Sequence, residues 1–291
     1  MPDKKKVIII VGPTASGKTH LAIELAKKIN GEIISADSMQ AYKGMPVISQ
    51  APSKKELRSV RHHLVGFLDP GKEYSAALFA KLAKKRMENM LKRRKIPIVV
   101  GGSGLYIKSL VDGLFPSRGK NEKLRKKLWA TAEKESSVAL HDTLKKMDPN
   151  AASRIHQNDT KRIIRAIEIC KIEKNTKTAL QKKTKGIKDK YEIEMMGIKM
   201  DRNILYERIN KRVEEMFKKG LLKEVKKLLG KKLSITAGQA LGIRQIKTYL
   251  EKKCGIEEAK EILKKDTRRF AKRQLTWFRA DKRIKWVKKL Y

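Results

Sequence analysis

The sequence has few cysteines, few acidic residues for its length and no long hydrophobic run. Its 291 residues include only two cysteines, Cys170 and Cys254, which lie far apart and match no zinc-ligand spacing. Cys170 falls in the apolar pattern of a helix, which favours a reduced core residue. No segment approaches membrane-spanning length. Residues 1–6 lead directly into the first expected strand and leave no room for a signal peptide, so we expect a cytoplasmic protein without a membrane segment.

Acidic residues are far outnumbered by basic ones. The 31 Asp and Glu residues stand against 71 Lys and Arg residues, which gives a formal net charge of +40. So large a positive charge repels itself unless counterions or a polyanion screen it, and it attracts nucleic acid. A lysine-rich proteome bias is the alternative explanation, because much of the lysine falls on ordinary helix faces. Together with the motifs below, the charge favours a nucleic-acid partner.

The segment 7–19, VIIIVGPTASGKT, predicts a phosphate-binding loop between a buried strand and a helix. Its β-branched start is typical of a strand buried on both faces. The residues that follow complete the G-x-x-x-x-G-K-[ST] pattern: Gly12, Pro13, Thr14, Ala15, Ser16, Gly17, Lys18 and Thr19. The backbone N–H groups of such a loop and the adjoining helix start bind phosphate, and Lys18 adds a mobile charge. Thr19 is placed to ligate Mg²⁺. A chance glycine-rich turn is the alternative.

A carboxylate follows the second expected strand, which covers residues 32–36. The carboxyl end of a parallel strand lies at the ligand-binding edge of the sheet. Asp37 is therefore the candidate general base or metal ligand. A helix N-cap or a turn is the alternative role for an aspartate at this position.

Two further strands are expected at residues 62–68 and 96–100. The adjacent His62 and His63 point to opposite faces of a strand and therefore do not form a chelate. The segment after residue 100, GGSG, indicates that the backbone approaches another group closely there. This strand does not end in the aspartate that Walker-type ATPases use, which disfavours ordinary ATP hydrolysis.

The chain changes character after residue 115. Residues 116–189 are charged, helix-like and without a buried strand, so we expect a helical insertion domain in a core formed by residues 1–115 and 190–291. Within it, one helical face can be buried while Lys161, Arg162 and Arg165 face a phosphate backbone. A solvated basic helix face is the alternative. A strand at 191–200 is expected to rejoin the sheet.

Long amphipathic helices are expected at 204–219, 222–229 and 256–279. The last of these interleaves basic and aromatic residues, a composition that suits contact with nucleic acid. Packing between helices accounts equally well for the aromatic residues, so only the basic ones support a nucleic-acid partner.

The ordered motifs resemble those of one family. They include GPTASGKT, ISADSMQAYKGM, HHLVGFLDP, IVVGGSGLYI, DTKRIIRAIEI and TRRFAKRQLTWFR, which together span nearly the whole chain. In this order they resemble bacterial tRNA dimethylallyltransferases. The resemblance implies an α/β fold: a P-loop NTPase-like parallel sheet flanked by helices, with an all-helical insertion that contacts tRNA. It also implies transfer of a dimethylallyl group to N6 of the adenosine immediately 3′ of the anticodon, in tRNAs that read codons beginning with U, with release of diphosphate.

The resemblance also implies roles for residues. The phosphate loop would hold the donor, dimethylallyl diphosphate, with Mg²⁺, and Lys18, Thr19 and Asp37 would be catalytic, with Asp37 accepting a proton from the adenosine amine. Either Arg208 or Arg212 would reach the diphosphate. The target base would swing out of the anticodon loop. Residues implied to contact tRNA are Asp37, Ser38, Met39, Gln40, Ser103, Arg125, Lys161, Arg162, Ile163, Ile164 and Arg165.

The chain departs from the family pattern at two places. Ser103 stands where the family usually has threonine, and its hydroxyl preserves the expected RNA contact. Residues 46–52, PVISQAP, differ from the usual sequence, so no role is carried over to this loop.

Two other functions remain open at this point. A P-loop kinase for a small metabolite would use the same loop, with Asp37 activating a hydroxyl group. A non-enzymatic RNA-binding protein with a vestigial loop is disfavoured by the intact Lys18, Thr19 and Asp37. We expect a monomer, because one anticodon stem-loop fits one cleft.

Overall fold

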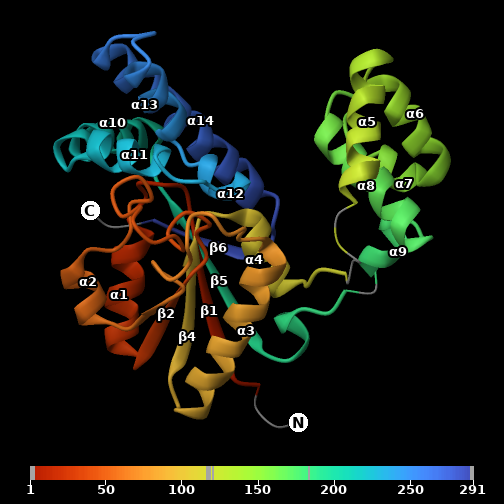
Figure 1. Ribbon diagram of the computed structural model, residues 1–291. Helices are drawn as coiled ribbons and strands as arrows, with labels where there is room; N and C mark the ends of the chain where they lie inside the picture. Colours follow the sequence, from red (N-terminus) through yellow and green to blue (C-terminus); the bar gives the residue numbers. More distant parts are fainter. Residues whose placement is uncertain (1–3, 116–118, 120, 183, 289–291) are drawn as a thin grey trace. The chain divides into compact units, whose positions relative to one another are not determined.

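The computed structural model describes residues 4–115, 119, 121–182 and 184–288. The chain divides into two compact units (Figure 1). The first contains Met1–Val111 and Ile187–Tyr291, and the second contains Asp112–Gly186. The second unit thus begins four residues earlier, and ends three residues earlier, than the insertion expected at 116–189.

A six-stranded parallel sheet forms the centre of the first unit, in the order β3-β2-β4-β1-β5-β6. Its strands are β1 (Lys6–Val11), β2 (Gly31–Ser35), β3 (His62–His63), β4 (Ile96–Gly101), β5 (Glu192–Lys199) and β6 (Ile284–Lys288). In the register of β1, Ile10 lies opposite Val100 of β4 and Met196 of β5. This parallel sheet with flanking helices confirms the predicted fold class.

Both faces of the sheet are buried, as the apolar strands require. Alternate residues of β1 enter two different clusters: Ile8 and Ile10 pack against α1, and Val7, Ile9 and Val11 belong to the larger cluster that contains α3 and α4. The helices of this unit are α1 (Lys18–Lys28), α2 (Lys54–Ser59), α3 (Ala76–Lys92), α4 (Gly104–Val111), α10 (Arg202–Lys218), α11 (Leu221–Leu229), α12 (Ile235–Gly238), α13 (Ile243–Leu250) and α14 (Ile256–Arg279), with a 3₁₀ turn at Ile187–Asp189. Figure 1 shows α10, α11, α13 and α14 beyond the carboxyl ends of the strands.

The strand predicted at 62–68 is wrong in extent, because β3 contains only His62–His63. Leu64 and Gly66 adopt positive φ angles of 62° and 57° and turn the chain away from β2. Gly66 and Phe67 then donate their N–H groups to the carbonyls of Gln40 and Ala41. The segment therefore follows the loop after β2 rather than β2 itself.

The described part of the second unit contains helices and no strand. It consists of α5 (Glu122–Lys134), α6 (Ser137–Met147), α7 (Pro149–Ala152), α8 (Thr160–Glu173) and α9 (Lys177–Lys182). Leu128, Leu140, Leu144, Ile163 and Ile167 belong to a hydrophobic cluster made only of residues from this unit. The unit thus has its own core.

No helix in the described ranges combines the length and the apolar character needed to cross a membrane.

Candidate active site

The phosphate-binding loop joins β1 to α1 in the conformation that its glycines permit. Gly17 has a φ of 83°, in the left-handed region, and immediately precedes α1. No side chain caps this helix start, so its first N–H groups face outward, as anion binding requires. Ser16 is fully buried, and within the described residues its hydroxyl has no hydrogen-bond partner. A buried unsatisfied hydroxyl in such a loop is consistent with a ligand site.

Lys18 lies within this loop. Its Nζ donates a hydrogen bond to the Pro13 carbonyl at 3.2 Å. Burial lowers the pKa of the Lys18 ammonium group to about 8, while Asp37 opposes this shift and the cation of Arg212 adds to it. Lys18 therefore lies close enough to the carboxylate of Asp37 and the guanidinium group of Arg212 for their charges to change its pKa.

Asp37 follows β2 after one residue, at the sheet edge where the sequence analysis placed it. Its Oδ1 accepts the N–H groups of Met39 at 2.9 Å and Gln40 at 3.4 Å, so this oxygen fixes the turn. Its Oδ2 accepts no hydrogen bond from the described residues. The turn therefore occupies only one of the two oxygens of this carboxylate.

A cavity of about 340 Å³ connects these groups. Its polar lining includes Thr14, Lys18, Asp37, Ser38, Ser103, Arg212, Arg273 and Gln274. Its apolar lining includes Met39, Ile48, Val213, Met216, Leu263 and Phe270. The cavity therefore has both cationic groups for phosphate and an apolar wall for a hydrocarbon.

Arg212 contacts the phosphate loop. Its Nη1 donates to the Thr14 hydroxyl at 3.2 Å, and its side chain lines the cavity. Arg208 is not among the residues that line this cavity. The geometry thus distinguishes two arginines that the sequence left equivalent.

Gln274 of α14 is a site residue that the sequence analysis missed. Its Oε1 accepts the Thr14 N–H at 2.9 Å, and its Nε2 donates to the Gly102 carbonyl at 3.0 Å. A Cβ atom at Gly102 would lie 2.2 Å from that Nε2, and one at Gly104 would lie 2.2 Å from the Trp277 ring. The close approach predicted from the glycine cluster is therefore, for these two glycines, an approach to α14.

The residues implied to contact tRNA fall into two groups. In the first unit, Ser38, Met39 and Ser103 line the cavity with Asp37. The side-chain amide of Gln40 is engaged within the unit, because it accepts from the Ser35 hydroxyl and donates to the Gln50 carbonyl.

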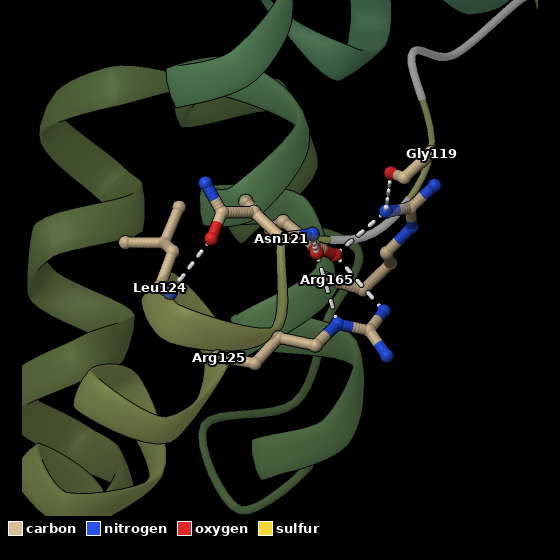
Figure 2. A network of polar contacts seen from close by, with 6 residues as sticks. Gly119, Asn121, Leu124, Arg125 and Arg165 are labelled. Atoms are coloured by element: carbon tan, nitrogen blue, oxygen red, sulfur yellow. Dashed lines mark hydrogen bonds and ion pairs between the residues drawn. The ribbon is translucent and has the colours of Figure 1, made fainter.

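The second group lies on α5 and α8 of the helical unit. Lys161 and Arg162 are exposed. The side chains of Ile163 and Ile164 are 0% and 3% exposed and pack in the helical core. Their side chains therefore do not face solvent, and the tRNA contact implied for this segment stays a prediction. Arg125 and Arg165 both bind the carboxylate of Glu168 (Figure 2).

Sequence and structure comparisons find related proteins. The sequence pattern of the IPP transferase family matches residues 40–281. A tRNA dimethylallyltransferase of Acetivibrio thermocellus is 47% identical over 97% of this chain and 91% of that protein. One of Carboxydothermus hydrogenoformans is 50% identical over the same shares of the two chains.

Two solved structures are also similar. A tRNA isopentenylpyrophosphate transferase of Bacillus halodurans has a TM-score of 0.72 and 39% identity, over 98% of this chain and 90% of that chain. A eukaryotic dimethylallyltransferase acting on tRNA has a TM-score of 0.77 and 29% identity, over 98% of this chain and 74% of that chain.

Proposed function

The chain belongs to the tRNA dimethylallyltransferase family, a family of enzymes that transfer a prenyl group to tRNA, and from this premise we propose its donor, its target atom and its catalytic residues. The donor is dimethylallyl diphosphate. The target is N6 of the adenosine immediately 3′ of the anticodon, in tRNAs that read codons beginning with U. The kinase alternative is not favoured, because the relatives are prenyltransferases.

The cavity is the observation that carries this proposal. It brings Lys18 and Arg212 to the same chamber as Asp37. It also provides an apolar wall that includes Met216, Leu263 and Phe270. A small metabolite that is phosphorylated does not need such a wall, whereas a five-carbon isoprenoid gains free energy from burial against it.

The diphosphate would be held by the phosphate loop. The N–H groups at the start of α1 and the cations of Lys18 and Arg212 stabilise the negative charge that grows as diphosphate leaves the allylic carbon. Thr19 and Asp37 line one small cavity, and oxygen ligands of this type suit Mg²⁺, so we assign Thr19 to hold it. When bound, the ion neutralises charge on the departing diphosphate.

Asp37 would act as the general base. The bond between the allylic carbon and the diphosphate oxygen breaks as the bond from that carbon to N6 of adenosine forms. The proton of N6 passes to Oδ2 of Asp37, the oxygen that the turn does not use. Ser38, Met39 and Ser103 line the same cavity and would contact the target nucleoside, while Lys161 and Arg162 would bind tRNA phosphates. We propose a monomer.

Replacing Asp37 with asparagine tests the base directly. The amide side chain would keep an oxygen that accepts from Met39 and Gln40, so the Asp37→Asn variant should fold and bind tRNA. It cannot take a proton, and we expect kcat to fall by roughly 10²–10⁴-fold. The measurement is incorporation of labelled dimethylallyl diphosphate into tRNA, with tRNA affinity measured separately.

Asp69→Asn is the matched control. Asp69 also accepts a backbone N–H in a turn, from Gly71 at 2.8 Å, but it is not among the cavity-lining residues. We expect this control to retain wild-type kcat. An Asp37→Asn enzyme that retained wild-type kcat would remove Asp37 from the chemistry.

A further inference from the structure

A buried carboxylate organises one end of the helical unit. Glu168 of α8 is 0% exposed. It accepts hydrogen bonds from Nε and Nη2 of Arg125, both at 2.9 Å, and from Nη1 of Arg165 at 2.6 Å. The N–H of Asn121 donates to the same carboxylate at 2.8 Å. Four donor groups from three residues therefore fix one acidic side chain.

The carboxylate is charged in spite of its burial. Burial raises the pKa of the Glu168 carboxyl group, but the hydrogen bonds from Arg125, Arg165 and Asn121 outweigh this effect and lower it. Among Glu168, Arg125 and Arg165, one carboxylate thus faces two guanidinium groups, which cannot lose their protons.

The two arginines are fixed but not fully enclosed. The Glu168 carboxylate holds Arg125 along its Nε–Nη2 edge, and Arg125 Nη1 carries no hydrogen bond to the described residues. The side chains of Arg125 and Arg165 are 24% and 33% exposed. In Figure 2 the guanidinium group of Arg165 lies above that of Arg125, and both are on the right-hand side of the network of polar contacts.

A purely structural ion pair would explain this cluster less well. One arginine is enough to neutralise a buried carboxylate, whereas Glu168 binds two. Lys161 and Arg162, on the same helix, are also exposed. The guanidinium group of Arg125, whose orientation is already fixed, loses little entropy when its Nη1 binds a phosphate.

We propose that Glu168 is a positioning residue, which holds Arg125 and Arg165 as a fixed pair for a backbone phosphate of the RNA substrate. This proposal rests on the proposed function for the identity of that RNA as tRNA. Glu168 itself touches no RNA and acts through the two arginines.

The test is Glu168→Gln, which makes the helical unit one charge more positive. Long-range electrostatics alone predicts tighter tRNA binding. Our proposal predicts the opposite, because the arginines lose their common anchor. We expect the KM for tRNA to rise about tenfold with little change in kcat or in the KM for the donor, and the slope of log affinity against log salt to become shallower by about 1 to 2.

Glu133→Gln is the matched control. Glu133 is exposed on α5 of the same unit, so this variant makes the same change in charge without touching the cluster. Its tRNA affinity should equal or exceed that of the wild type. If Glu168→Gln binds tRNA as tightly as Glu133→Gln with an unchanged salt slope, the proposal is overturned.

Arg125→Lys keeps the proposal testable if Glu168→Gln fails to fold. A lysine preserves the charge but cannot contact carboxylate and phosphate along two edges of one plane, so tRNA affinity should fall. Where Glu168→Gln does fold, its effect should be smaller in the double variant than in the wild type. Wild-type affinity and salt slope in Arg125→Lys would overturn the proposal. The proposed function is tested separately, by whether the wild-type enzyme prenylates tRNA.

Discussion

Lys18 is the residue whose titration should control donor binding. Its pKa is lowered to about 8, first by burial and then by Arg212, against the opposing effect of Asp37. The charged form, which we propose binds diphosphate, exists below this pKa. We therefore expect kcat/KM for dimethylallyl diphosphate to fall as pH rises through about 8, because kcat/KM reports the protonation of the free enzyme.

Arg212→Met should change this profile in two ways. At neutral pH we expect kcat/KM for the donor to fall about 10²-fold, since one cation on the leaving diphosphate is lost. The descending limb should move to higher pH, since removing Arg212 raises the pKa of Lys18. Steady-state kinetics between pH 6 and 10 measures both effects. Arg208→Met is the control, because Arg208 is not a cavity-lining residue, and it should alter neither. An unchanged limb in Arg212→Met would contradict the coupling.

Most residues of the candidate site could be predicted from the sequence, because they belong to motifs that are continuous in the chain. The phosphate loop follows β1 and Asp37 follows β2, two strands of the same parallel sheet that are separated by β4. Gln274 was missed because it reaches Thr14 from 260 positions away, and a glutamine within a long helix has no local signal. Ile163 and Ile164 were included as part of a contiguous motif, and the helical period places their side chains in the core of the helical unit.

The end of β4 packs so closely against the residue after β2 that adding a single methyl group should push the two backbones apart. A Cβ atom at Gly101 would lie 2.2 Å from the Ala36 carbonyl oxygen, which is backbone and cannot rotate away. We expect Gly101→Ala to lower the free energy of unfolding by about 1–3 kcal/mol. It should also lower kcat, because Ala36 immediately precedes Asp37. Urea unfolding and the prenylation assay measure the two effects.

Gly238→Ala is the control for that variant. Gly238 ends α12, and a Cβ atom there would meet nothing within 4 Å. Alanine is the better helix former, so stability should stay the same or rise slightly. Equal stability of the Gly101→Ala and Gly238→Ala proteins would contradict close packing as the reason for glycine at residue 101.

At the scale of elements, long periodic segments were predictable and short edge elements were not. The helix expected at 256–279 matches α14 in both bounds. The last strand, β6, was missed because two of its five residues are lysines and it pairs only with β5. The strand β3 was overextended because its apolar residues continue past the turn at Leu64. In each case tertiary pairing, which the local pattern does not contain, decided the outcome.

For the molecule as a whole, the net charge follows directly from the sequence. With 71 basic and 31 acidic residues, most cations have no acidic partner to pair with. The excess favours association with a polyanion and makes it depend on salt. The set of elements that forms the cavity could not be predicted from the sequence, because α10 and α14 supply Arg212 and Gln274 from distant parts of the chain.

The separate core of the helical unit predicts that this unit folds alone. Leu144 is 0% exposed and belongs to a cluster drawn only from this unit. A fragment covering residues 112–186 should therefore show helical circular dichroism and a cooperative thermal transition, although a unit of this size is only marginally stable. Leu144→Ala should abolish that transition, because such a cavity costs about 2–5 kcal/mol. Val138→Ala, at a side chain that is 40% exposed, should leave it nearly unchanged. A fragment without helical structure would show that this core needs the rest of the chain.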